Sequence, residues 1–187
     1  DYAAFKNCQM LTNVGLSSAL TTIGMNAFDG CVALDNVDIP ESVTEIHSNA
    51  FKGTASLKSF TLHEGIQTLN TAVFEESALT SIYIPKTLSE TNDPFSGSNI
   101  TEVRFGEGIT TLTNTLFADA GKLTEITIPD TVSHIGSFCF KGTNIEAIVI
   151  PDSVKTIDRS AFEDCDNLYA VKFGAGVTKI PDFCFND

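Results

Sequence analysis

The most constraining feature of this 187-residue sequence is a ladder of phenylalanines at nearly constant spacing. Nine of its fourteen phenylalanines form the ladder: Phe5, Phe28, Phe51, Phe74, Phe95, Phe117, Phe140, Phe162 and Phe185. Successive members lie 21 to 23 residues apart, which indicates an internal repeat rather than chance. A unit this short cannot bury its apolar side alone, so neighbouring units must stack into one core. The sequence therefore predicts a solenoid of about eight coils.

Each interval carries one apolar skeleton, L-x-x-V-x-I-P-x-x-V-x-x-I-x-x-x-A-F-x-x-C. The alternation of Val37 and Ile39 predicts a short strand with both side chains inward, which Pro40 ends because it cannot donate a ladder hydrogen bond. Residues 43–46 predict a second extended segment, and the polar lead into Ala50-Phe51 suits a single helical turn. We expect short parallel strands stacked in one or two sheets, one strand per coil along one face, with short helical turns between them.

One coil departs from this skeleton. Thr91 stands where isoleucine is expected, the coil is shortened, and Pro94 removes a backbone donor just before Phe95. We therefore expect residues 88–95 to be the least regular part of the stack and to differ in strand and turn pattern from residues 132–140.

Both ends of the chain fall within a repeat. It opens on Ala4-Phe5 and closes on Cys184-Phe185, each of which is the tail of a repeat. Solenoids normally shield their terminal coils with a polar cap. We expect residues 1–187 to form a single solenoid domain, to be a fragment of a longer protein, and to leave Phe185 partly exposed.

Several stretches share one closely kept motif, namely Val37-Asp38-Ile39-Pro40, Ile126-Thr127-Ile128-Pro129-Asp130-Thr131-Val132, Ile150-Pro151-Asp152-Ser153-Val154 and Ala161-Phe162-Glu163-Asp164-Cys165. This motif resembles the BspA-like, or Treponema-type, leucine-rich repeats over essentially the whole chain. The resemblance implies a right-handed solenoid without catalytic residues. It also implies a secreted or cell-surface microbial protein that takes part in adhesion and host contact.

The charge balance disfavours two classes of partner. The chain has 24 acidic and 11 basic residues and a net charge of −13. Phosphate backbones and anionic membrane surfaces both require clustered lysine and arginine, so we expect no nucleic-acid partner. No apolar run is long enough to insert into a membrane. We expect the charge to keep an elongated protein soluble and monomeric, with a cationic partner or calcium as the alternative.

The five cysteines occupy repeat positions that suit small buried side chains: Cys8, Cys31, Cys139, Cys165 and Cys184. Their spacing does not suit zinc, so we expect reduced, buried thiols without a metal. Cys8 and Cys31 stand on successive repeats, which leaves a disulfide between them as the alternative.

Other candidates for chemistry are weak. His47, His63 and His134 fall at different repeat positions, and the Gly106-x-Gly108 segment lacks a following phosphate-loop signature. A row of turn carboxylates could recruit calcium, but Lys86 interrupts it: Glu41, Glu64, Glu107, Asp130 and Asp152. Acidic residues are also ordinary turn residues, which is the interpretation we favour. We expect neither catalysis nor a cofactor.

Candidate binding residues come from the outward positions of the predicted strand. The residue between Val and Ile forms this column: Gly15, Asp38, Thr61, Tyr83, Arg104, Thr127, Val149 and Lys172. Tyrosine and arginine are enriched in binding hot spots, so Tyr83 and Arg104 are the leading candidates. The predicted protein-binding residues are Tyr83, Arg104, Asp38, Glu102, Glu125 and Lys172. The alternative is that Tyr83 and Arg104 only stack on each other as a cross-strand pair.

Together these features favour a non-enzymatic protein-interaction scaffold, used for adhesion or partner contact by a secreted or cell-surface microbial protein. One alternative is a carbohydrate- or matrix-binding segment, which would want an exposed aromatic platform. The other is a targeting module for an enzyme whose catalytic domain lies outside this chain.

Overall fold

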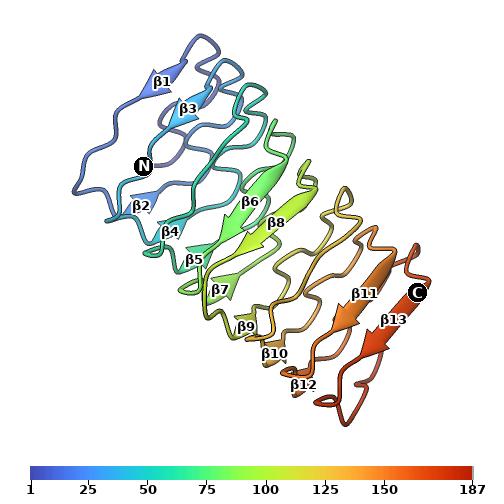
Figure 1. The fold of residues 1–187 in the computed structure, drawn as a ribbon. Coiled ribbons are helices and arrows are strands. Elements are labelled where there is room, and N and C mark those ends of the chain that lie inside the picture. The colour runs from blue at the N-terminus through green and yellow to red at the C-terminus, as the bar shows by residue number, and fades with distance from the viewer. Residues whose placement is uncertain (187) are drawn as a thin grey trace.

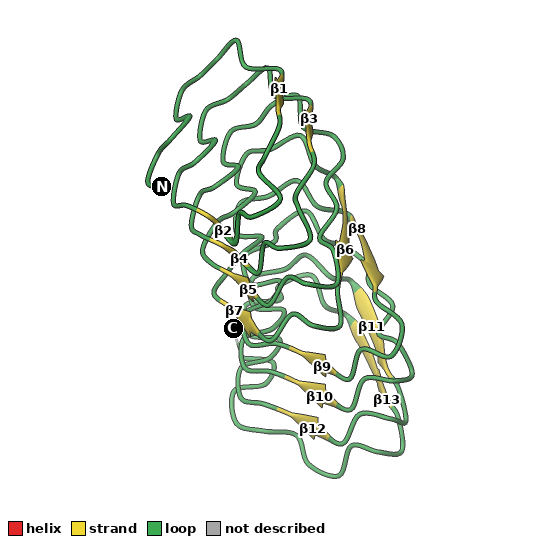
Figure 2. Cartoon of the chain, turned by 90° about the vertical axis from the view of Figure 1, so that its left-hand side faces the viewer, coloured by secondary structure: helices red, strands yellow, loops and turns green. Residues whose placement is uncertain are grey.

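The computed structural model describes residues 1–186 as a stack of coils with the two ends of the chain at opposite ends of the stack (Figure 1). Two columns of short parallel strands follow the stack on different sides (Figure 2). The first column contains β1 (Asn13–Val14), β3 (Asn36–Val37), β6 (Ser81–Ile84), β8 (Glu102–Phe105), β11 (Ala147–Ile150) and β13 (Ala170–Phe173). The second contains β2 (Thr22–Ile23), β4 (Glu45–Ile46), β5 (Thr68–Leu69), β7 (Glu90–Thr91), β9 (Thr111–Leu112), β10 (His134–Ile135) and β12 (Thr156–Ile157).

The strands that form lie at positions that the repeat predicts. Along β6, Ile82 and Ile84 are buried while Tyr83 is half-exposed, which is the alternation expected of a strand over a core. The second extended segment, predicted at residues 43–46, forms a strand over its last two residues, as β4. Strands line two sides of the stack rather than one, because each coil passes both sides and can pair with its neighbours on each.

Both columns are interrupted. The first column divides into the pairs β1–β3, β6–β8 and β11–β13, because residues 58–62 and 124–128 form no strand between them. The second column divides once, between β7 and β9. The stack is therefore continuous in its core but not in its backbone ladders.

The phenylalanine ladder is the axis of the core. Its successive rings stack with centroids 5.1 to 5.9 Å apart and interplanar angles of 4° to 19°. The seven interior rings are at most 1% exposed. Phe5 and Phe185, the two end members, are partly exposed, as expected for Phe185.

The predicted helical turn before each ladder phenylalanine is wrong. Asn49 and Gly53 flank Phe51 in the left-handed region, with φ of 57° and 65°, and a right-handed helix cannot include such residues. The Phe51 N–H donates to the Val73 carbonyl of the next coil at 2.9 Å, whereas a helix needs the carbonyl four residues earlier. These segments are turns, and the described residues contain no helix that could cross a membrane.

The coil around Thr91 is only partly irregular. Its strand β7 pairs in register with β5, so the expected loss of the usual strand pattern in residues 88–95 is wrong. The break in the ladder lies on the opposite side, toward β9. There the Thr91 hydroxyl lies 2.7 Å from the Thr113 hydroxyl, and the Thr115 hydroxyl donates to the Thr91 carbonyl at 3.3 Å. Side chains thus replace the missing ladder hydrogen bonds.

All five cysteines are free thiols, so Cys8 and Cys31 are not bridged in this structure. Cys31, Cys139, Cys165 and Cys184 are buried, which confirms the expectation for these four. Cys8 is exposed, contrary to expectation, because it belongs to the first coil and has a neighbouring coil of this chain on one side only. Burial raises the pKa of the Cys139 thiol well above its usual range.

Candidate functional site

Five of the six predicted binding residues lie beside β6, β8, β11 and β13, on the side of the stack that we call the first strand face. Tyr83 and Arg104 are direct cross-strand neighbours in the β6–β8 pair, and Lys172 is the neighbour of Val149 in the β11–β13 pair. Glu102 stands on β8, and Glu125 lies in the interrupted segment at residues 124–128. The outward column predicted from the repeat is thus confirmed where the strands pair.

Tyr83 does not offer a free hydroxyl. It donates a short hydrogen bond to the carboxylate of Glu64, and this bond together with burial raises the pKa of Tyr83 to about 12. Gly106 makes room for the pair, because a Cβ there would stand 2.8 Å from both the Tyr83 hydroxyl and the Glu64 carboxylate. Tyr83 is therefore a fixed, half-buried part of the face.

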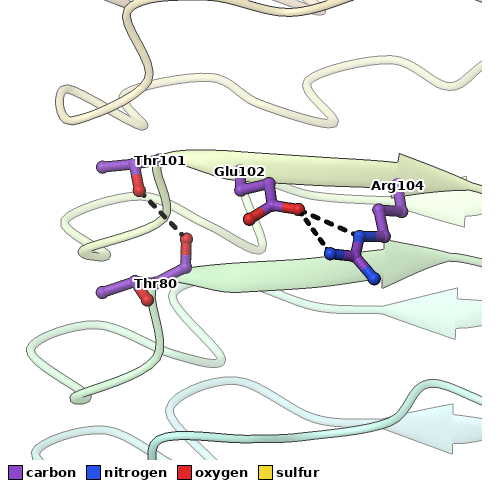
Figure 3. Close-up of polar contacts among 4 residues, drawn as sticks. All are labelled: Thr80, Thr101, Glu102 and Arg104. Atoms are coloured by element: carbon purple, nitrogen blue, oxygen red, sulfur yellow. Dashed lines mark hydrogen bonds and ion pairs between the residues drawn. The ribbon is translucent and has the colours of Figure 1, made fainter.

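Arg104 is bound within its own strand. Its Nε and Nη2 atoms donate to one carboxylate oxygen of Glu102 at 2.9 and 2.8 Å (Figure 3). The two side chains are 75% and 56% exposed, so water screens the ion pair and its contribution to folding stability is small. Arg104 and Tyr83 are neighbours in register, but the charged group of Arg104 turns to Glu102.

A shallow groove of about 770 Å³ lies on the first strand face where the strand column is interrupted between β8 and β11. Three of the predicted residues line it: Glu102, Glu125 and Lys172. Its apolar floor includes Val149, which points outward, and the exposed parts of Val103 and Ile126, which pack against the core. Val149 is 59% exposed, and the other two are partly exposed.

A smaller groove of about 160 Å³ lies at the other interruption of the same column, at residues 58–62. The sixth predicted residue, Asp38, lines it together with Phe60 and His63. The Nδ1 atom of His63 accepts a hydrogen bond from the Gly65 N–H at 2.9 Å. The structure therefore separates Asp38 from the other five predicted residues.

Sequence reasoning missed the main feature of the large groove, which is its backbone. Among residues 1–186, the N–H and C=O groups of residues 125–128 make no hydrogen bond to another protein group. The apolar floor formed by Val103, Ile126 and Val149 was also not identified. No signal in the sequence marks the interruption, because residues 123–129 follow the same motif as residues 145–151, which do form β11.

The opposite side of the stack, the second strand face of β2, β4, β5, β7, β9, β10 and β12, differs in composition. Its outward column alternates threonine with charged residues or histidine: Thr22, Glu45, Thr68, Glu90, Thr111, His134, Thr156 and Lys179. Many of its polar groups bond to neighbouring coils. His134, for example, lies 3.0 Å from both the Asp158 carboxylate and the Thr156 hydroxyl. The side chains of the second strand face are thus mainly strand-forming residues that stabilise the stack, which is less true of the first strand face.

Two observations concern metal ligands and catalytic side chains in the described part of the chain. Within residues 1–186, no group of three or more His, Cys, Asp and Glu side chains is arranged to hold a metal ion. His134, Thr156 and Asp158 bring a hydroxyl, an imidazole and a carboxylate together, but on an open strand face where each is at least partly exposed.

Comparison with solved structures identifies the same fold in bacterial proteins. A leucine-rich repeat protein from Bacteroides ovatus is 22% identical over 97% of this chain and 66% of its own, with a TM-score of 0.62. A leucine rich cell surface protein from Faecalibacterium prausnitzii is 23% identical over 91% of this chain and 62% of its own, with a TM-score of 0.52. The pneumococcal vaccine antigen PcpA is 18% identical over 94% of this chain and 56% of its own, with a TM-score of 0.54.

At these identities the likeness shows the fold alone, and the chain spans about two thirds or less of the length of each of these proteins. No curated protein matches the sequence significantly. The family model described as the BspA type leucine rich repeat region (6 copies) matches residues 1–94 and 91–187, which together cover the whole chain. The chain therefore belongs to the BspA-type leucine-rich repeat family.

Proposed function

We propose that this protein is a non-enzymatic interaction scaffold that binds a partner protein on its first strand face, in adhesion or host contact at a microbial surface. Proteins of this repeat family are generally non-catalytic scaffolds. A cell-surface protein and a vaccine antigen among the similar structures support an extracellular setting.

The observation that carries the proposal is the difference between the two strand faces. The first strand face holds a groove whose apolar floor is partly exposed and whose backbone groups at residues 125–128 have no partner within residues 1–186. Protein-binding surfaces combine an apolar centre with a polar rim, and this groove has both. On the second strand face, by contrast, threonine and charged side chains bond across the coils.

Site-specific photocrosslinking tests the choice of face. A photoreactive residue is placed at Thr127, on the first strand face, and at Thr111, an exposed threonine on the second. Each variant is incubated with host cells and with the extracellular fraction of the source culture, and is then irradiated. We expect discrete protein adducts from the Thr127 variant and none above background from the Thr111 variant. Adducts from the Thr111 variant alone would assign binding to the other face.

A further inference from the structure

The large groove of the first strand face offers free backbone hydrogen-bonding groups beside two formed strands. In the part of the chain that the structure describes, β8 pairs only with β6 on its far side, and β11 pairs only with β13. Between them, the four residues 125–128 use none of their N–H or C=O groups within the described chain. Water satisfies such groups in the free protein, and a ligand that covers them must replace those hydrogen bonds. An extended peptide backbone supplies donors and acceptors at the required spacing.

The floor of the groove suits alternate side chains of an extended segment. Three successive coils contribute to it: Val103 and Ile126 pack against the core and remain partly exposed, and Val149 points outward and is 59% exposed. An extended ligand points every second side chain toward the surface on which it lies. Apolar residues at alternate positions would therefore cover the floor while the others meet the rim.

The rim is acidic. Glu102, Glu125 and Asp130 line the groove against a single lysine, Lys172. Glu102 already holds Arg104, whereas Glu125 and Asp130 have no side-chain partner among the described residues. The whole chain carries a charge of −13, which strengthens the attraction of a basic segment and repels an acidic one.

We propose that the groove over residues 125–128 binds an extended, basic segment of the partner protein, held by backbone hydrogen bonds to these residues and by lysine or arginine side chains at Glu125 and Asp130. This inference rests on the proposed function and names the class of ligand for the same face. The four residues with free backbone groups match the four-residue length of β8 and β11, so the bound segment spans roughly 13 Å at the usual rise of a strand.

Three synthetic hexapeptides with blocked ends provide the probes, each labelled with fluorescein. The first alternates lysine and valine, the second alternates glutamate and valine, and the third is the first peptide with N-methyl groups at alternate backbone amides. Binding to the purified chain is measured by fluorescence anisotropy at low and physiological salt. We expect the first peptide to bind at least about tenfold more tightly than the other two, because the second reverses the charge and the third removes backbone donors.

Protein variants locate the site. Glu125→Lys with Asp130→Lys should weaken binding of the lysine–valine peptide by about tenfold or more. The matched control, Glu41→Lys with Glu90→Lys, makes the same change in net charge at exposed positions that do not line the groove, and should weaken binding less than about threefold. Val149→Ser, which removes an exposed apolar side chain of the groove without adding charge, should also weaken binding, and circular dichroism verifies that each variant folds.

Any of three results would overturn the inference. The N-methylated peptide could bind as tightly as the lysine–valine peptide, both charge-reversal pairs could lose binding equally, or the lysine–valine peptide could fail to bind. These outcomes are separate from a failure of the proposed function. If the Thr127 variant still crosslinks to a partner protein while the peptides fail, the face is an interface but the ligand class is wrong.

Discussion

Substitution of Phe117, in the middle of the ladder, should remove a large part of the stability of the whole stack. Its ring is completely buried and lies 5.8 Å from the Phe95 ring and 5.6 Å from the Phe140 ring. Phe105 also meets it edge-on at 6.3 Å. A fully buried Phe→Ala substitution costs about 3–5 kcal/mol, and the upper half of this range applies because coils on both sides hold the cavity open.

Two further variants separate ring stacking from burial. Phe117→Leu keeps most of the apolar volume but loses two stacked contacts of about 0.5–1.5 kcal/mol each, so it should cost about 1–3 kcal/mol. Phe5→Ala removes a partly exposed ring that stacks on one neighbour only, at 5.2 Å from Phe28, and should cost less than half as much as Phe117→Ala.

Urea unfolding followed by circular dichroism measures all three free energies of unfolding, with the slope compared among variants to detect loss of cooperativity. The reasoning fails if Phe5→Ala and Phe117→Ala cost the same. It also fails if Phe117→Leu costs as much as Phe117→Ala, because the stacked geometry would then add nothing beyond burial.

Three more predictions address the rest of the stack. Thr113→Val removes the hydroxyl contact with Thr91 and should lower the free energy of unfolding by about 1 kcal/mol. In the same urea titration, Thr111→Val at an exposed position should change the free energy of unfolding by less than about 0.5 kcal/mol. Burial raises the pKa of the Cys139 thiol, so the unfolded chain loses this proton at lower pH than the folded one, and stability should fall as pH rises above about 8.5, by up to about 1.4 kcal/mol per pH unit. Cys139→Ala should lose less stability between pH 8.5 and 10 under reducing conditions, and an identical slope in both proteins would refute this cause. Finally, absorbance titration should find Tyr83 ionising near pH 12, and Glu64→Ala should lower its pKa toward about 10; an unchanged value would show that Glu64 is not responsible.

The periodic features of the fold are predictable because they depend on short-range pattern. The ladder spacing and the alternation at Ile82 and Ile84 follow from side-chain periodicity, and the structure confirms both. The helical turn was mispredicted because a polar lead into Ala-Phe also suits a turn with left-handed residues, and a few residues do not distinguish the two. Asn49 and Gly53, which tolerate positive φ better than most residues, were the available signal.

The candidate site was predictable only in part. The outward column identified Glu102, Glu125 and Lys172, which line the large groove, because strand alternation fixes which side chains face solvent. The hydrogen bond between Tyr83 and Glu64 joins residues 19 positions apart, and no local pattern specifies it. Within the described residues, the backbone of residues 125–128 makes no hydrogen bond to the coils on either side. The repeat motif is the same in coils that do pair, so the sequence pattern does not predict this difference.

Amide hydrogen exchange of the free protein, resolved residue by residue by nuclear magnetic resonance, tests the central claim that the first strand face carries an open, unpaired segment. The account predicts that the amides of residues 125–128 exchange at rates close to those of exposed peptides, while Ile148 and Ile150 in the neighbouring strand β11 are strongly protected. Protection of residues 125–128 equal to that of β11 would show a continuous strand column, and would contradict the account of the groove.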